Sequence, residues 1–161
     1  MDPSIDLVWL INKNEKTNIP SYITQVEIKN HVEMLKAYAC ATVIIQNQPF
    51  PIIPKGKNQM FIQTWHGDRG FKKCLKESEH ADCGRLLEEI DGKCDYALAG
   101  STFAEKFYRS SFGYHGTILK YGCPRNDVLL NPDAQRVKEI KQKLEIDNST
   151  KVLLYAPTLR R

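Results

Sequence analysis

Short apolar runs alternate with stretches of helical periodicity along most of the chain. The runs predict strands at residues 6–11, 42–46, 60–64, 96–99, 117–121 and 151–156. The first, Asp6 to Ile11, is a continuous apolar run typical of a strand buried on both faces. Helical spacing predicts helices over 28–41, 83–90 and 133–144, and one that opens at Ser101. Strands separated by helices form βαβ units, so the pattern predicts an α/β fold, a parallel sheet with helices on both faces.

Polar and glycine-rich segments follow several of the predicted strands. Such sheets bind ligands beyond the carboxyl ends of their strands, which directs attention to Trp65-His66-Gly67, Gly100-Ser101, the segment 122–127 and the segment 157–160. Glycine lets a ligand approach the backbone, and Arg and Lys donate to phosphate oxygens. Ser101 is expected to cap a helix whose free N–H groups point into the same crevice.

His66 is the main candidate for acid–base chemistry. A histidine titrates near neutral pH and can accept a proton from an attacking hydroxyl. The alternative is a histidine that is hydrogen-bonded in a packed turn beside Trp65. The glycine after His66 and the basic residues that follow favour the functional interpretation.

The basic candidates each have a structural alternative. Lys72 and Lys73 suit a phosphate contact or the solvation of a helix start equally well. Arg125 could bind a phosphate, although pairing with Asp127 to hold the turn after Pro124 is the safer interpretation. The aromatic residues of the helix after Ser101, which include Phe103, Phe107 and Tyr108, are expected to face inward.

Composition narrows the function classes only slightly. The net charge of +4 suits phosphate-rich ligands or an anionic membrane surface, and it suits an ordinary soluble domain as well. The basic residues are not interleaved with exposed aromatic residues, so no nucleic-acid partner is expected. The five cysteines form no C-x-x-C pair, which argues against a zinc site and favours reduced thiols in the cytoplasm. No apolar stretch is long enough to cross a bilayer, and the first residues do not resemble a secretory signal.

Four motifs follow one another in a fixed order: FIQTWHG at 61–67 with Lys72-Lys73 after it, CDYALAGSTFAEKFYRSSFGY at 94–114, YGCPRNDVLL at 121–130 and KVLLYAPTLR at 151–160. In this order and spacing they resemble the CDP-glycerol glycerophosphotransferase family of teichoic-acid primases and polymerases. The resemblance implies a GT-B-like fold of two Rossmann-like domains. It further implies that residues 1–150 are a partial N-terminal, acceptor-side domain, and that residues 151–161 begin a truncated nucleotide-binding domain. The chain is therefore expected to be an incomplete N-terminal half that is partial or inactive alone.

The resemblance also implies a reaction. Family members transfer glycerol phosphate from CDP-glycerol to a lipid-linked teichoic-acid-type acceptor and release CMP. His66 is then the candidate general base, and no metal or other cofactor is expected. The candidate substrate contacts are Gly67, Lys72, Lys73, Ser101, Arg125, Asn126, Asp127 and Arg160. The expected location is peripheral, at the cytoplasmic face of the membrane. The alternative function is a non-catalytic module that binds a polyanionic acceptor or an anionic membrane surface.

Overall fold

A computed structural model of the chain describes residues 4–12, 19–47, 53–67 and 92–156. The chain divides into two compact units, Met1–Cys123 and Pro124–Arg161, and each is described by itself. The predicted helix at 83–90 lies outside the described residues, as do Lys72, Lys73 and Arg160.

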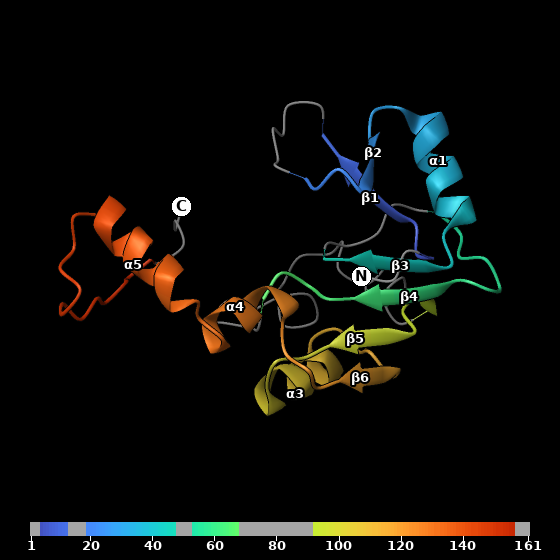
Figure 1. Ribbon diagram of the computed structural model, residues 1–161. Coiled ribbons are helices and arrows are strands. Elements are labelled where there is room, and N and C mark those ends of the chain that lie inside the picture. Colours follow the sequence, from blue (N-terminus) through green and yellow to red (C-terminus); the bar gives the residue numbers. More distant parts are fainter. Residues whose placement is uncertain (1–3, 13–18, 48–52, 68–91, 157–161) are drawn as a thin grey trace, which may run out of the picture. The chain divides into compact units, whose positions relative to one another are not determined.

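A four-stranded parallel sheet forms the centre of the first unit (Figure 1). Its strands are β3 (Val43–Gln46), β4 (Met60–Gln63), β5 (Tyr96–Leu98) and β6 (Thr117–Leu119), side by side in that order. The register pairs Gln46 with Gln63, Gln63 with Ala97, and Ala97 with Ile118. Four of the predicted strands and the parallel α/β architecture are thereby confirmed.

A separate two-stranded parallel sheet contains β1 (Leu7–Ile11) and β2 (Ile23–Glu27). The predicted strand at 6–11 exists, but the prediction that it is buried on both faces is wrong. Val8 and Trp9, which point to opposite faces, are 49% and 52% exposed. The reason is that β1 pairs only with β2 among the described strands, so neither sheet face is fully covered at this point. The sequence pattern did not predict β2.

Two helices of the first unit begin at side-chain caps. In α1 (His31–Cys40), Asn30 accepts a hydrogen bond from the Glu33 N–H at 3.3 Å. In α3 (Thr102–Ser110), Ser101 Oγ accepts one from the Ala104 N–H at 3.0 Å, which confirms the predicted cap.

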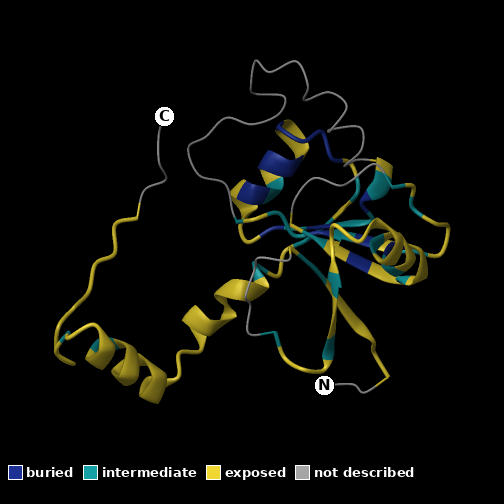
Figure 2. Ribbon diagram, turned by 90° about the horizontal axis from the view of Figure 1, so that it is seen from above, coloured by how far each residue is buried: buried dark blue, intermediate teal, exposed yellow. Residues whose placement is uncertain are grey.

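The inner face of α3 supplies much of the core. Phe107 and Tyr108 are buried as predicted, but Phe103 is 61% exposed and its inward prediction is wrong. The buried stripe runs through Ala104, Phe107 and Tyr108, at helical spacing, and Phe103 lies at its margin. Figure 2 shows this division along α3 as alternating buried and exposed bands. Phe112 and Tyr114, which follow the helix, are almost completely buried.

The second unit contains η2 (Pro124–Asn126), α4 (Asp127–Leu130) and α5 (Ala134–Lys143). Asp133 caps α5 through the Gln135 N–H at 2.9 Å, and the predicted helix at 133–144 is confirmed. The predicted strand at 151–156 is wrong, because these residues form no strand and are all exposed (Figure 2). Leu153 is 94% exposed. A strand needs a neighbour for its backbone groups, and no strand lies among the described residues of this unit.

None of the described helices has the length and apolar character needed to cross a membrane.

Candidate functional site at the carboxyl ends of the strands

The carboxyl ends of parallel strands meet at one edge of the sheet, and here backbone hydrogen bonds connect neighbouring ends. The Thr64 N–H donates to the Gln46 carbonyl at 2.8 Å, which joins the ends of β4 and β3. The Ala99 N–H donates to Leu119 O at 2.9 Å, and the Gly122 N–H donates to Ala99 O at 3.2 Å. The segments that contain His66, Gly67 and Ser101 therefore leave the sheet at the same edge, as the strand pattern predicted.

His66 is exposed at this edge and is held by the end of β3. Its Nδ1 lies 3.2 Å from the carbonyl oxygen of Asn47. A carbonyl only accepts hydrogen bonds, so Nδ1 must carry the proton in this contact. In the neutral ring Nε2 is then unprotonated and is the atom able to accept a proton.

Trp65 has an unusual backbone conformation beside the histidine. Its φ of +52° lies in the left-handed region, which costs a bulky residue about 1–3 kcal/mol unless its surroundings hold it. The Trp65 N–H donates to Gln63 Oε1 at 2.8 Å, and the Trp65 ring meets the Phe112 ring edge-on at a centroid distance of 4.8 Å. The ring also stacks on His66, with the centroids 4.4 Å apart.

The turn therefore combines features of both interpretations of His66. The histidine is hydrogen-bonded beside Trp65, as the packed-turn alternative predicted, yet its side chain is exposed where a ligand can reach it. Gly67 follows with φ +139°, a conformation that favours glycine, so the backbone after His66 depends on this residue type.

Ser101 lies at the start of α3 and uses its hydroxyl oxygen to cap the helix. The role of Ser101 as a substrate contact stays a prediction. Glu105, in the first turn of the same helix, forms an ion pair with Lys120 at 2.6 Å.

Arg125, Asn126 and Asp127 lie in the second unit, in η2 and the first turn of α4. All three are exposed, and their predicted role stays a prediction. Three of the predicted site residues, His66, Gly67 and Ser101, thus follow the carboxyl ends of the neighbouring strands β4 and β5.

Sequence reasoning missed two residues at this edge, Asn47 and Gln63. Gln63 is completely buried within a strand that is otherwise mostly apolar, and a glutamine at such a position was the available signal. Asn47 acts through its backbone carbonyl, 19 residues before His66, and no side-chain pattern marks such a contact.

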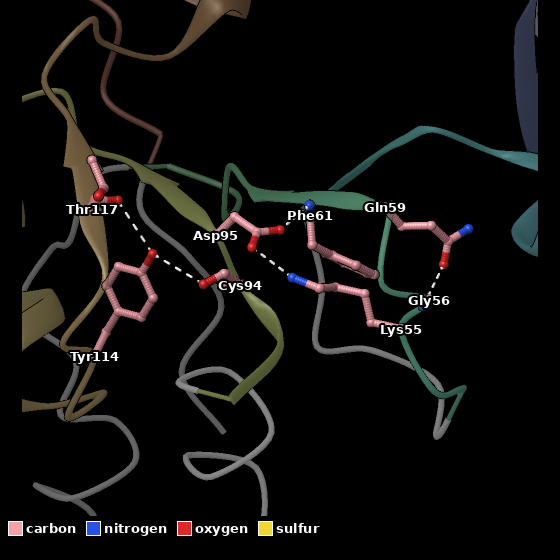
Figure 3. A network of polar contacts seen from close by, with 8 residues as sticks. All are labelled: Lys55, Gly56, Gln59, Phe61, Cys94, Asp95, Tyr114 and Thr117. Carbon is pink, nitrogen blue, oxygen red and sulfur yellow. Dashed lines mark hydrogen bonds and ion pairs between the residues drawn. The ribbon is translucent and has the colours of Figure 1, made fainter.

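The amino ends of the strands carry a different network (Figure 3). Lys55 Nζ pairs with Asp95 Oδ1 at 2.6 Å, and the Phe61 N–H donates to Asp95 Oδ2 at 2.6 Å. Partial burial acts to raise the pKa of Asp95. The hydrogen bond from Lys55, those from backbone N–H groups and the lysine charge outweigh burial and lower it overall.

A cavity of about 260 Å³ lies near this network, between α1, β3 and the segment before β4. Its lining is mainly apolar and includes Tyr38, Ile44 and Phe61. Figure 3 also shows the buried Tyr114, whose hydroxyl lies 3.3 Å from Cys94 O and 3.2 Å from Thr117 O.

The fold is that of an α/β protein with a parallel sheet, and His66 lies exposed at the carboxyl ends of its strands. Comparison with known proteins gives the family. The profile of the CDP-glycerol:poly(glycerophosphate) glycerophosphotransferase family matches residues 1–161, and the chain belongs to this family.

Curated relatives and solved structures agree with this assignment. The chain is 29% identical to the teichoic acid poly(glycerol phosphate) polymerase of Bacillus spizizenii, over 96% of this chain and 41% of that protein. It is 28% identical to the teichoic acid glycerol-phosphate transferase of Staphylococcus aureus, over 96% of this chain and 42% of the relative. The structure of the wall teichoic acid polymerase TagF matches with a TM-score of 0.83 and 28% identity, over 99% of this chain and 41% of that one. The chain thus spans less than half the length of these relatives.

Proposed function

We propose that this chain supplies the acceptor-side part of a glycerophosphotransferase, which transfers glycerol phosphate from CDP-glycerol to a hydroxyl of a lipid-linked teichoic-acid-type acceptor. Family membership supports the reaction class and favours it over a non-catalytic binding module. The observation that carries the proposal is the contact of His66 Nδ1 with Asn47 O, which leaves Nε2 as the basic atom at the exposed strand-end edge.

In the proposed reaction the acceptor hydroxyl donates its proton to His66 Nε2 as its oxygen attacks the phosphorus that bears glycerol. The bond from this phosphorus to the bridging oxygen breaks, and CMP leaves with that oxygen. The histidine later releases the proton to solvent. General-base help of this kind contributes about 10²–10⁴-fold, and positioning and charge stabilisation of the phosphoryl group supply the larger part.

The remaining predicted contacts have complementary roles in this proposal. Gly67 and Ser101 lie at the edge where the acceptor would approach. Lys72, Lys73, Arg125 and Arg160 supply positive charge for the diphosphate, and Asn126 and Asp127 bind polar groups of the substrate. In domain terms, residues 1–150 belong to the acceptor-side domain and residues 151–161 begin the nucleotide-binding domain. A lipid-linked acceptor would place the enzyme at the cytoplasmic face of the membrane as a peripheral protein.

The test is CMP release from CDP-glycerol with a lipid acceptor primed with glycerol phosphate. This chain and a full-length family member would be assayed side by side, each with the His66→Ala substitution or its equivalent. We expect the substitution to lower the rate by about 10²–10⁴-fold in whichever protein turns over. His31→Ala is the control in this chain, because His31 is an exposed residue at the start of α1. A near-normal rate after loss of the His66 imidazole would overturn the proposal.

A further inference from the structure

We infer that Gln63 is a positioning residue for His66. Its buried side-chain oxygen holds Trp65 in the left-handed conformation, and this turn seats the His66 ring against the Asn47 carbonyl so that Nε2 is the basic atom. The inference rests on the proposed role of His66, and it concerns how the protein selects one tautomer and one orientation of that ring.

The first step is the burial of Gln63 inside β4. Its exposure is 0%, and the side-chain oxygen accepts the Trp65 N–H at 2.8 Å. A buried amide is unfavourable unless it is hydrogen-bonded, and a methionine would fill a similar volume without that requirement. The amide is therefore explained by its hydrogen bonds rather than by its volume.

The second step is the conformation that this hydrogen bond maintains. Trp65 has φ +52°, where an aromatic residue is not expected without external support. The Thr64 hydroxyl also donates to the Trp65 carbonyl at 3.0 Å. The aromatic ring is anchored by its edge-on contact with Phe112, which is only 1% exposed. The turn is thus fixed on both sides of Trp65.

The third step is the transfer of this geometry to His66. The imidazole stacks on the Trp65 indole at an angle of 28°, so the indole limits the planes that the imidazole can adopt. Asn47 O then receives the Nδ1–H at 3.2 Å. Because Gln46 and Gln63 are register partners, the ends of β3 and β4 stay adjacent and the carbonyl remains within reach.

The direct test is nitrogen NMR of the His66 ring at alkaline pH, where a histidine ring is neutral. In the unmodified chain we expect the Nδ1–H form to predominate, and a predominant Nε2–H form would overturn the inference. Gln63→Met is expected to shift the ring toward the tautomer mixture of an unconstrained histidine. The matched control is Gln46→Met, since Gln46 is the register partner and its side chain donates to the Tyr38 hydroxyl instead. An unchanged tautomer in Gln63→Met would also overturn the inference.

A second variant covers the case in which Gln63→Met fails to fold. Gln63→Asn keeps the amide but is one methylene shorter, so the hydrogen bond to Trp65 should be lost and the Nδ1–H form should again decrease. Retention of the full Nδ1–H signal in a folded Gln63→Asn protein would contradict the positioning role.

Turnover gives a separate readout. In the protein that releases CMP, the Gln63 substitution or its equivalent should lower kcat by about 10–100-fold with little change in the KM for CDP-glycerol, since a displaced base affects chemistry more than nucleotide binding. A rise in KM at constant kcat would count against the inference. The two proposals can be refuted separately. If Gln63→Met shifts the tautomer while His66→Ala turns over normally, Gln63 positions the His66 ring but His66 is not the catalytic base.

Discussion

In the four-stranded sheet, the edge formed by the amino ends of the strands (the amino edge) and the edge formed by their carboxyl ends (the carboxyl edge) use polar groups in opposite ways. At the amino ends of the strands, Asp95 binds both Lys55 and a backbone N–H, and the Tyr114 hydroxyl lies between two carbonyl oxygens (Figure 3). At the carboxyl ends, His66 is exposed on a turn in which the residues on either side of it, Trp65 and Gly67, both have positive φ. The amino edge uses its polar groups to hold strands together, whereas the carboxyl edge maintains an unfavourable backbone conformation around an exposed side chain.

This difference is informative about function. Unfavourable backbone conformations persist where the surroundings hold them, and they cluster at active sites. Ion pairs and buried hydroxyls that join neighbouring segments mainly contribute to stability. We therefore expect the largest effects on turnover from substitutions at the carboxyl ends, and the largest effects on the free energy of unfolding from substitutions at the amino ends.

The largest expected contrast compares His66→Ala with Lys55→Met. His66→Ala should lower the rate of CMP release by about 10²–10⁴-fold, because the proton acceptor is lost. Its free energy of unfolding should change by less than about 0.5 kcal/mol, because the side chain is exposed. Lys55→Met should leave the rate within about twofold of normal, since Lys55 lies at the other edge. Rates would be measured by CMP release and stabilities by urea denaturation, and similar effects of both variants on the rate would remove the distinction between the edges.

The next effect is on stability at the amino edge. A Cβ atom at Gly116 would lie 2.3 Å from the Tyr114 hydroxyl oxygen and 2.5 Å from the adjacent ring carbon. Because Tyr114 is completely buried, Gly116→Ala should destabilise the fold by about 1–3 kcal/mol. Urea denaturation measures the change. Gly92→Ala is the control, since a Cβ atom there meets nothing within 4 Å. Equal stabilities of the two variants would contradict the role given to Tyr114.

A smaller effect is expected at the start of α3. Ser101→Ala removes the acceptor of the Ala104 N–H and should destabilise the protein by about 1 kcal/mol. Ser101→Thr keeps a hydroxyl and should retain most of this stability. If Ser101 also contacts substrate, Ser101→Ala would raise the KM in the CMP-release assay beyond what the stability loss explains. An unchanged KM would restrict Ser101 to its capping role.

The smallest effect concerns the ion pair at the amino edge. Lys55→Met should cost no more than about 1 kcal/mol, because both side chains are partly exposed and solvent screens the pair. The pKa of Asp95 is lowered by folding, so the stabilisation is present above the unfolded carboxyl pKa and is lost as the pH falls through the lower folded pKa. The difference in unfolding free energy between the unmodified chain and Lys55→Met should therefore shrink in the acid range. A difference that grew on acidification would contradict this assignment.

The sheet could largely be predicted from the sequence because its strands are short, apolar and rich in β-branched residues, such as Val43 to Ile45. β2 was missed because Thr24 and Gln25 interrupt its apolar pattern. The run at 152–155 has the composition of a strand, but composition cannot supply the neighbouring strand that pairing requires.

The candidate site was only partly predictable for a related reason. The parallel topology places His66, Gly67 and Ser101 at the carboxyl ends of the strands, and the predicted alternation of strands and helices was enough to predict this. The positions of Asn47 and Gln63 depend on the exact register of β3 and β4 and on a positive φ at Trp65. Neither is visible in a pattern of apolar and polar residues.

The central claim is that His66 accepts the proton of the acceptor hydroxyl, and chemical rescue tests it most directly. CMP release by the His66→Ala protein would be measured with increasing concentrations of added imidazole, in whichever chain turns over. Because the His66 side chain is exposed, its removal should leave a position that a free imidazole can reach. We predict that imidazole restores part of the lost rate in His66→Ala and leaves the unmodified enzyme unaffected. A His66→Ala protein that releases CMP at the normal rate without imidazole would contradict the account.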